Sequence, residues 1–150
     1  MSVPLTQALG AMNSIGVFTL LAALLLSGCD RMDLSFSDYR ELAEADAMQS
    51  GWFPVWLPES AYDIRESHDI DTNQSMLVFR VRERAWRPPS DCLGIAPGNA
   101  PPAPYSRPWW PAEKDFEARP GISFYSCQDN VYVAVDDPNH LVFHWRPSGI

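Results

Sequence analysis

Three oxygen-bearing side chains, Asp69, Asp71 and Asn73, alternate along the chain in the pattern that opens a calcium-binding loop. Alternate carboxylate and amide oxygens can converge on a hard cation. The pattern then ends, because Gln74 replaces the glycine of the tight turn and Arg80 stands where a bidentate glutamate would close the shell. We therefore predict no metal site, and expect a polar turn whose short side chains bond their own backbone.

The three histidines are the other candidates for metal binding or acid/base chemistry. His140 and His144 share one face of a predicted strand, but residues four apart on a strand lie roughly 13 Å apart, too far to share an ion. His68 beside Asp69 could form an acid/base pair, yet the sequence near it offers no activated Ser or Cys nucleophile. We expect surface or turn histidines and predict neither a catalytic site nor a cofactor. An enzyme with a site at His68 is the unfavoured alternative.

Charge excludes one class of partner. The formal net charge is −8 and the isoelectric point is about 4.7, whereas nucleic-acid phosphates require a basic face. Arg80, Arg82 and Arg84 alternate on a predicted strand and could bind phosphate or an acidic partner. We expect instead that this row is a solvated face paired with Asp63 and other carboxylates.

Tyr105, Trp109 and Trp110 are the strongest candidates for binding. They lie in segment 87–120, which holds nine of the 14 prolines and is predicted to be a long loop without regular structure. Aromatic side chains bury much area at little entropic cost and are enriched at binding surfaces. We predict that these residues contact another envelope protein. Stacking on sugar rings, as in peptidoglycan, is the first alternative, and packing into the core is weighed equally with binding.

An apolar leader precedes every charged residue of the chain. The run Ile15–Leu26 is followed by Ser27, Gly28 and Cys29, the small residues that a signal peptidase requires. Twelve helical residues span roughly 18 Å, which is short of the roughly 30 Å hydrocarbon core of a bilayer. We therefore predict an export signal over residues 1–28. The alternative is an uncleaved anchor that recruits residues 3–16.

The tetrapeptide Leu26-Ser27-Gly28-Cys29 resembles the lipobox of bacterial lipoproteins. The resemblance implies cleavage before Cys29, a lipid on its thiol and a domain that faces the periplasm. The leader departs from the family's usual pattern, because residues 1–14 contain neither Lys nor Arg. Asp30 resembles the signal for retention in the inner membrane, so the inner membrane is favoured and the outer membrane is the alternative.

A second block, Trp56–Asn73 (WLPESAYDIRESHDIDTN), is similar to one found in small uncharacterised bacterial lipoproteins. This resemblance implies an envelope location and carries no activity.

With Cys29 acylated, Cys92 and Cys127 form an even pair in an oxidising compartment, and we predict a disulfide between them. A reactive thiol working with a histidine is the alternative.

The sequence predicts an α+β fold with a small, mostly antiparallel sheet of about five strands, one N-terminal helix and a long Pro-rich loop. Residues 29–36 are predicted to be a tether and residues 37–150 a single domain. The predicted elements are a helix over 38–49, a bend over 52–58, strands over 62–70 and 75–83, and a meander of strands over 122–127, 131–135 and 141–145. In the hairpin we expect Ile70 opposite Ser75, Ile64 opposite Val81, and Asp63 opposite Arg82.

Together these features predict a non-enzymatic, lipid-anchored lipoprotein that binds another envelope protein. An immunity-type lipoprotein that neutralises a basic toxin is a further alternative, to which the acidic charge gives slight support.

Overall fold

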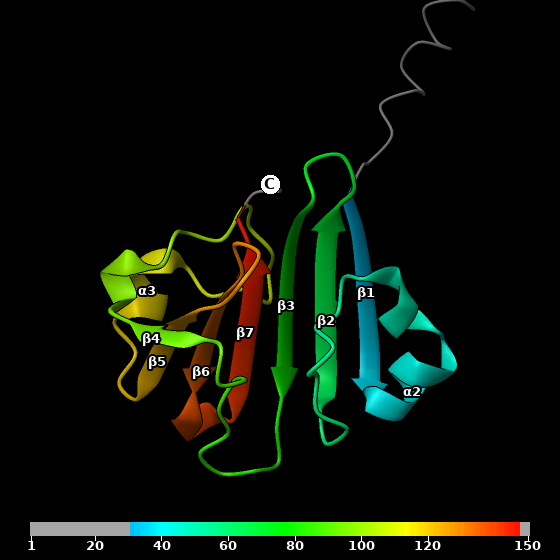
Figure 1. The fold of residues 1–150 in the computed structure, drawn as a ribbon, viewed down its shortest axis with the longest axis horizontal. Helices are drawn as coiled ribbons and strands as arrows, with labels where there is room; N and C mark the ends of the chain where they lie inside the picture. The colour runs from blue at the N-terminus through cyan, green and yellow to red at the C-terminus, as the bar shows by residue number, and fades with distance from the viewer. Residues whose placement is uncertain (1–30, 148–150) are drawn as a thin grey trace, which may run out of the picture.

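The computed structural model describes residues 31–147, so the predicted leader and Cys29 lie outside the described residues. The fold is mostly β: one seven-stranded antiparallel sheet in the order β1-β2-β3-β7-β6-β5-β4, with only short helices (Figure 1). The prediction of an α+β class with about five strands is therefore wrong, because the structure has seven strands and only short helices. The predicted antiparallel sheet is confirmed. The elements are β1 (Arg31–Asp38), α2 (Tyr39–Glu44), η1 (Ala47–Ser50), β2 (Tyr62–Asp69), β3 (Gln74–Arg80), β4 (Leu93–Ile95), η2 (Pro97–Asn99), α3 (Glu113–Glu117), β5 (Ile122–Ser126), β6 (Tyr132–Asp136), η3 (Asp137–Asn139) and β7 (Leu141–Arg146).

The predicted tether is wrong over its described part, because Arg31–Asp38 form edge strand β1. This strand pairs with β2 from Arg31 opposite Asp69 to Asp38 opposite Tyr62. Leu34 and Phe36 alternate with exposed residues and pack against the core. Arg31, two residues after Cys29, thus already belongs to the sheet.

The predicted N-terminal helix is present but short. Its predicted cap is confirmed, since the backbone N–H of Glu41 donates to Oδ1 of Asp38 at 2.9 Å, and Oε2 of Glu41 accepts from the backbone N–H of Ser37 at 2.6 Å. The helix ends at Glu44, and Asp46 then takes a positive φ of 53° that breaks the α-helical path before η1. The expected three turns are reduced to one helix of six residues and a 3-10 turn.

The β2–β3 hairpin forms with a register two residues from the predicted one. Asp69, not Ile70, ends β2 and lies opposite Gln74. A two-residue slip keeps every side chain on its predicted face, so Ile64 is still fully buried. Near the start of β2 the pairing shifts between Tyr62 and Arg65, where Asp63 has a φ of +48°.

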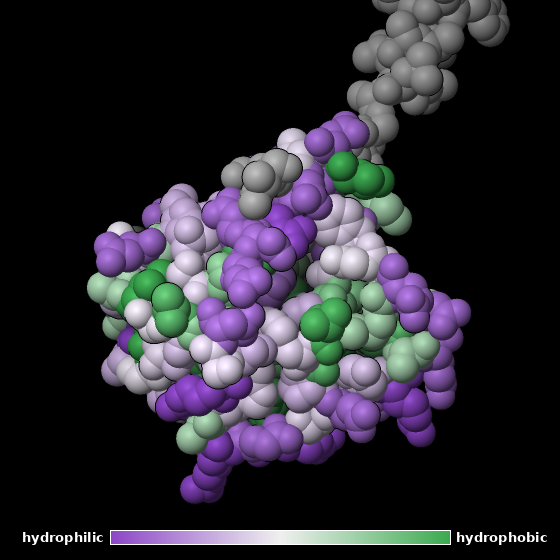
Figure 2. Space-filling model, in the orientation of Figure 1, coloured by the Kyte–Doolittle hydropathy of each residue, from purple (hydrophilic) through white to green (hydrophobic). Residues whose placement is uncertain are grey.

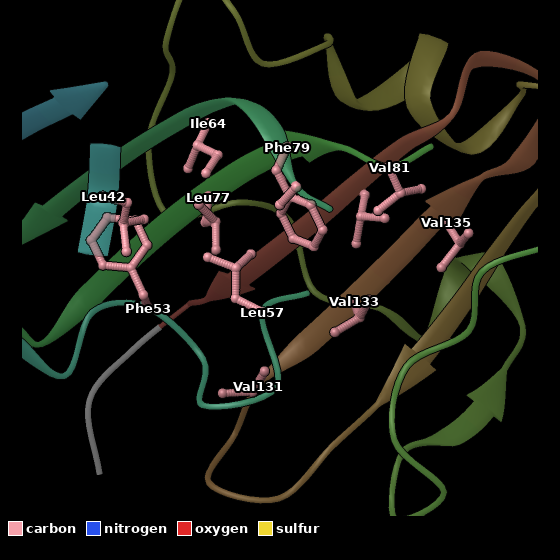
Figure 3. Close-up of a cluster of buried hydrophobic side chains, with 12 residues drawn as sticks. Leu42, Phe53, Leu57, Ile64, Leu77, Phe79, Val81, Val131, Val133 and Val135 are labelled. Carbon is pink, nitrogen blue, oxygen red and sulfur yellow. The ribbon is translucent and has the colours of Figure 1, made fainter. Parts of the chain in front are cut away.

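Two hydrophobic clusters lie on opposite faces of the sheet. The face shown in Figure 2 has scattered hydrophobic residues between larger hydrophilic areas. The first cluster contains Leu42, Phe53, Leu57, Ala61, Ile64, Leu77, Phe79, Val81, Val131, Val133, Val135 and Val142. Residues of α2 and of the bend 52–58 belong to it, and Phe53 lies beside Leu42 and Leu57 beside Leu77 (Figure 3). The second cluster contains Met76, Val78, Phe116, Phe124, Ala134, Phe143 and Trp145.

The Pro-rich segment covers the second cluster and is more regular than predicted. It contains β4, η2 and α3, each of three to five residues, in place of a structureless loop. The predicted disulfide is present: Cys92 and Cys127 are bonded with their Cα atoms 4.2 Å apart. It fixes the start of the segment beside the end of β5. The predicted meander is confirmed as β5, β6 and β7.

Candidate functional site

Trp110 anchors the Pro-rich segment to the second cluster. Its ring makes edge-to-face contacts with Phe143, Phe116 and Trp145, at centroid distances of 5.2, 5.8 and 5.9 Å. Trp109 contacts Trp110 at 6.1 Å, also edge to face. Both tryptophans are half-buried, so the structure gives Trp110 a packing role and leaves part of Trp109 at the surface.

Tyr105 holds the Pro-rich segment to β2. Its hydroxyl donates a hydrogen bond to the backbone carbonyl of Ser67 at 2.7 Å. Its ring is flanked by the guanidinium groups of Arg31 and Arg107, 4.6 and 4.9 Å from the centroid. Burial raises the pKa of the Tyr105 hydroxyl. Tyr105 is therefore a fixed part of the wall of the surface described next.

Two recesses open on this side of the molecule, and Trp110 and Pro111 line both of them. The first has a volume of about 470 Å³ and an apolar lining. Its walls are Ala100, Pro101, Pro102, Ala103, Tyr105, Ser106, Trp110, Pro111, Ala112, Glu113, Phe116, Glu117, Phe124 and Trp145. The second has a volume of about 310 Å³ and includes Trp109 and three arginines. We call these the apolar recess and the basic recess.

The arginines of the basic recess are oriented by carboxylates. Arg65 and Arg80 both pair with Asp63, at 3.1 Å and 3.4 Å, and Arg119 pairs with the buried Asp136 at 3.1 Å. Asp63 reaches both partners because the irregularity in β2 places it there with a positive φ. Two guanidinium groups share one carboxylate, so this cluster keeps a net positive charge.

The predicted row of Arg80, Arg82 and Arg84 does not form a strand face, because β3 ends at Arg80. Arg80 pairs with Asp63 as expected, whereas Arg82 lies over the ring of Tyr62 at 4.8 Å. Sequence reasoning missed Arg65 and Arg119, which come from β2 and from the end of the Pro-rich segment. The alternation along β2 did place Arg65 on the face of Asp63, but only the fold shows that this face meets Trp109.

His68 was expected at the surface or in a turn, and this expectation is wrong. It lies in β2, only 4% exposed, with its ring stacked on Trp52 at 4.2 Å. Its Nδ1 lies 2.9 Å from Oε2 of Glu66, which is 1% exposed. Burial and the nearby Asp33 raise the pKa of Glu66 to about 9, and burial lowers the pKa of His68. A protonated Glu66 that donates to neutral His68 satisfies both groups, and their burial leaves little room for a substrate.

The other histidines do not share a site. His144 is buried in β7 with its ring 5.7 Å from Trp56, and burial lowers its pKa to about 4. His140 precedes β7 with a φ of +55°, so it is not on the strand where it was predicted. Among residues 31–147, no group of three His, Cys, Asp or Glu side chains is arranged to hold a metal ion.

The turn after β2 is the polar turn that the sequence predicts. Oδ1 of Asp69 accepts the backbone N–H groups of Asp71 and Thr72, at 3.2 and 3.0 Å. Asn73 follows with a φ of +54°. One of the oxygen atoms of the calcium-loop pattern, Oδ1 of Asp69, is thus used by the turn itself.

In the comparison with known protein families, residues 30–80 match the model of the YbbD head domain. This range spans β1 to β3 and includes the whole of the second lipoprotein-like block, Trp56–Asn73, with Glu66 and His68. No curated protein and no solved structure matches the chain. Within the described part of the chain, no helix has the length and apolar character to cross a membrane.

Proposed function

We propose that this chain is a lipoprotein anchored by a lipid on Cys29 at the periplasmic side of the cell membrane, and that its domain binds another envelope protein. The observation that carries the binding proposal is the pair of recesses that share Trp110 and Pro111 as a wall. An apolar recess beside a basic one suits a protein segment with an apolar side chain next to an acidic one. The inner membrane is favoured by Asp30.

Charge supports an acidic contact in the basic recess. The chain as a whole carries a net charge of −8, yet Arg65 and Arg80 meet there over a single carboxylate, Asp63. A guanidinium group has five N–H donors in a planar fork, so donors are left for a second carboxylate. Local positive charge on an acidic protein favours a defined acidic partner over general attraction to anions.

The arrangement of the tryptophans favours a protein over a glycan. A sugar ring stacks on an exposed, flat aromatic face, whereas Trp109 and Trp110 meet edge to face and Trp110 is enclosed by Phe143 and Trp145. Only part of Trp109 is open to solvent. This geometry suits a side chain inserted beside Trp109 better than a sugar laid across it.

Site-specific crosslinking tests the binding proposal. A photoreactive p-benzoylphenylalanine at Ala112, an exposed residue of the apolar recess, is expected to form a discrete protein adduct in living cells. The same group at Arg84, an exposed residue outside both recesses, is the control. In the Ala112 variant, Arg65→Glu is expected to lower the adduct yield about tenfold, which corresponds to a loss of about 1.4 kcal/mol.

A protein adduct that is equally strong from both positions, or that is unchanged by Arg65→Glu, would contradict the proposed surface. An adduct to glycan alone would replace the protein partner by the glycan alternative.

The anchor has its own test. The intact and peptide masses of the protein purified from membranes are expected to show Cys29 as the acylated N-terminus and a linked Cys92–Cys127 pair. A retained leader with an unmodified Cys29 would exclude lipid anchoring. The Cys29→Ser variant is the control, and its product is expected to lack the acyl mass.

A further inference from the structure

We propose that the end of the sheet where β1 begins rests against the lipid surface, with Ile70 and Met32 in contact with the bilayer. This inference rests on the proposed anchor and adds to it which surface of the domain meets the membrane. Four features of the described residues carry it: the position of β1, the strand ends around it, the exposed apolar residues there and their arginine neighbours.

The chain between the anchor and the domain is very short. β1 begins at Arg31, only two residues after Cys29. Two residues span at most about 7 Å, so an acyl chain on Cys29 holds Arg31 at the headgroup level.

Several strand ends meet at this edge of the domain. Arg31 lies opposite Asp69, and Ser75 lies opposite Arg146. The start of β1, the β2–β3 turn and the end of β7 are therefore at one end of the sheet, as Figure 1 shows. An anchor at β1 brings all three to the membrane together.

Two exposed apolar side chains lie at this end. Ile70 is 59% exposed at the β2–β3 turn and Met32 is 47% exposed near the start of β1, and hydrophobic surface is visible there in Figure 2. They are two of the four large hydrophobic residues that are exposed in the described part of the chain. The hydrogen bonds from Asp71 and Thr72 to Asp69 fix the turn that presents Ile70.

Two arginines flank these apolar residues. Arg31 pairs with Asp69 at 3.3 Å, yet its side chain is 48% exposed, and Arg146 donates to Oδ1 of Asn73 at 3.4 Å. An apolar tip with guanidinium groups beside it is the composition of a segment that lies in the membrane interface, where arginine contacts lipid phosphate. The apolar side chains of the turn thus fit the acyl-chain boundary, and the arginines fit the layer of lipid phosphates above it.

This orientation restricts the partner. From its membrane end at Asp69, β2 extends over eight residues, about 23 Å, and Tyr105 is hydrogen-bonded to Ser67 near that end. The recesses then face sideways along the bilayer at a height within this span. A protein in or on the same membrane is within reach, whereas a distant cell-wall layer is not.

Depth-dependent quenching tests the orientation. The acylated full-length protein is reconstituted into vesicles of phosphatidylethanolamine and phosphatidylglycerol, with a nitrobenzoxadiazole label on Ile70→Cys. The label attaches only there, because Cys29 is acylated in this proposal and Cys92 is bonded to Cys127. Arg84→Cys, beyond the far end of β3, is the matched control, and Thr72→Cys is a second position in the same turn.

Nitroxide groups on the upper part of the lipid chains are expected to quench the label at residue 70 at least threefold more than the label at residue 84. Residue 72 should follow residue 70. Equal quenching at residues 70 and 84 in protein that floats with the vesicles would overturn the orientation and leave the anchor intact. Failure to float would overturn both.

Discussion

Replacing Cys92 and Cys127 together by serine is expected to lower the free energy of unfolding by about 4 kcal/mol. The bond joins residues 35 apart in the sequence, so the closed loop includes nearly all of the Pro-rich segment. Without the bond the unfolded chain gains the entropy of that loop. A domain whose total stability is typically about 5 to 15 kcal/mol would lose a large part of it.

Urea unfolding followed by tryptophan fluorescence measures this loss. Reduction of the parent protein should reproduce the midpoint of the double variant, and reductant should leave the double variant unchanged. A loss below about 1 kcal/mol would show that the unfolded chain gains little entropy without the bond, as when contacts such as those of Trp110 with Phe143 and Trp145 persist in the unfolded state.

The sequence predicted the strands whose apolar residues alternate and whose ends carry turn residues. The meander β5–β6–β7 matches the prediction within one or two residues, and the β2–β3 hairpin formed with its faces as expected. The two-residue error in the hairpin arose because Asp69 is the last residue of β2 and its side chain bonds the turn, so that Ile70 lies outside the strand. Faces follow from the alternation of side chains, whereas the register depends on one side chain's hydrogen bonds.

Two strands were missed for different reasons. β1 has a readable alternation, Leu34 and Phe36 against Asp33 and Ser35, but its nearness to the lipobox favoured a tether. β4 is three residues long, and no local pattern shows its pairing with β5, which lies beside the disulfide. Residue propensity and hydrophobic periodicity do not predict short elements that are stabilised by distant contacts.

The candidate site was predicted only in part. Tyr105, Trp109 and Trp110 do gather on one side of the molecule, over the second cluster. The basic recess also needs Asp63 in a positive-φ conformation and Arg119 paired with Asp136. These features follow from a strand irregularity and from long-range packing, so the sequence alone gave the aromatic half of the surface.

The buried pair of Glu66 and His68 leads to the second large effect: Glu66→Gln is expected to remove a loss of stability at alkaline pH. The pKa of Glu66 is about 9 in the folded protein, against an ordinary value of 4.5. Between these values the folded protein keeps a proton that the unfolded chain has released. The free energy of unfolding therefore falls as the pH rises through this window, by about 1 kcal/mol per pH unit.

The histidines act in the opposite direction at lower pH. His144 has a pKa of about 4 in the folded protein, against an ordinary value of 6.5. Its contribution to the free energy of unfolding is therefore present above pH 6.5 and is lost as the pH falls toward 4. His68, whose pKa is also lowered by burial, acts in the same sense. The effect of Glu66 is consequently separated from theirs between pH 6.5 and 9.

Urea unfolding of the parent, Glu66→Gln and Glu59→Gln between pH 6.5 and 9 tests this expectation. Glutamine imitates the protonated carboxyl group and its amide can donate to Nδ1 of His68, so Glu66→Gln should unfold with a nearly flat pH dependence and exceed the parent most at pH 9. Glu59 is an exposed glutamate, and its variant makes the same chemical substitution outside the buried pair, so it should keep the parent's slope. A slope that persists in Glu66→Gln would mean that the buried proton is held by another group, and the pairing of Glu66 with a neutral His68 beneath Trp52 would have to be abandoned.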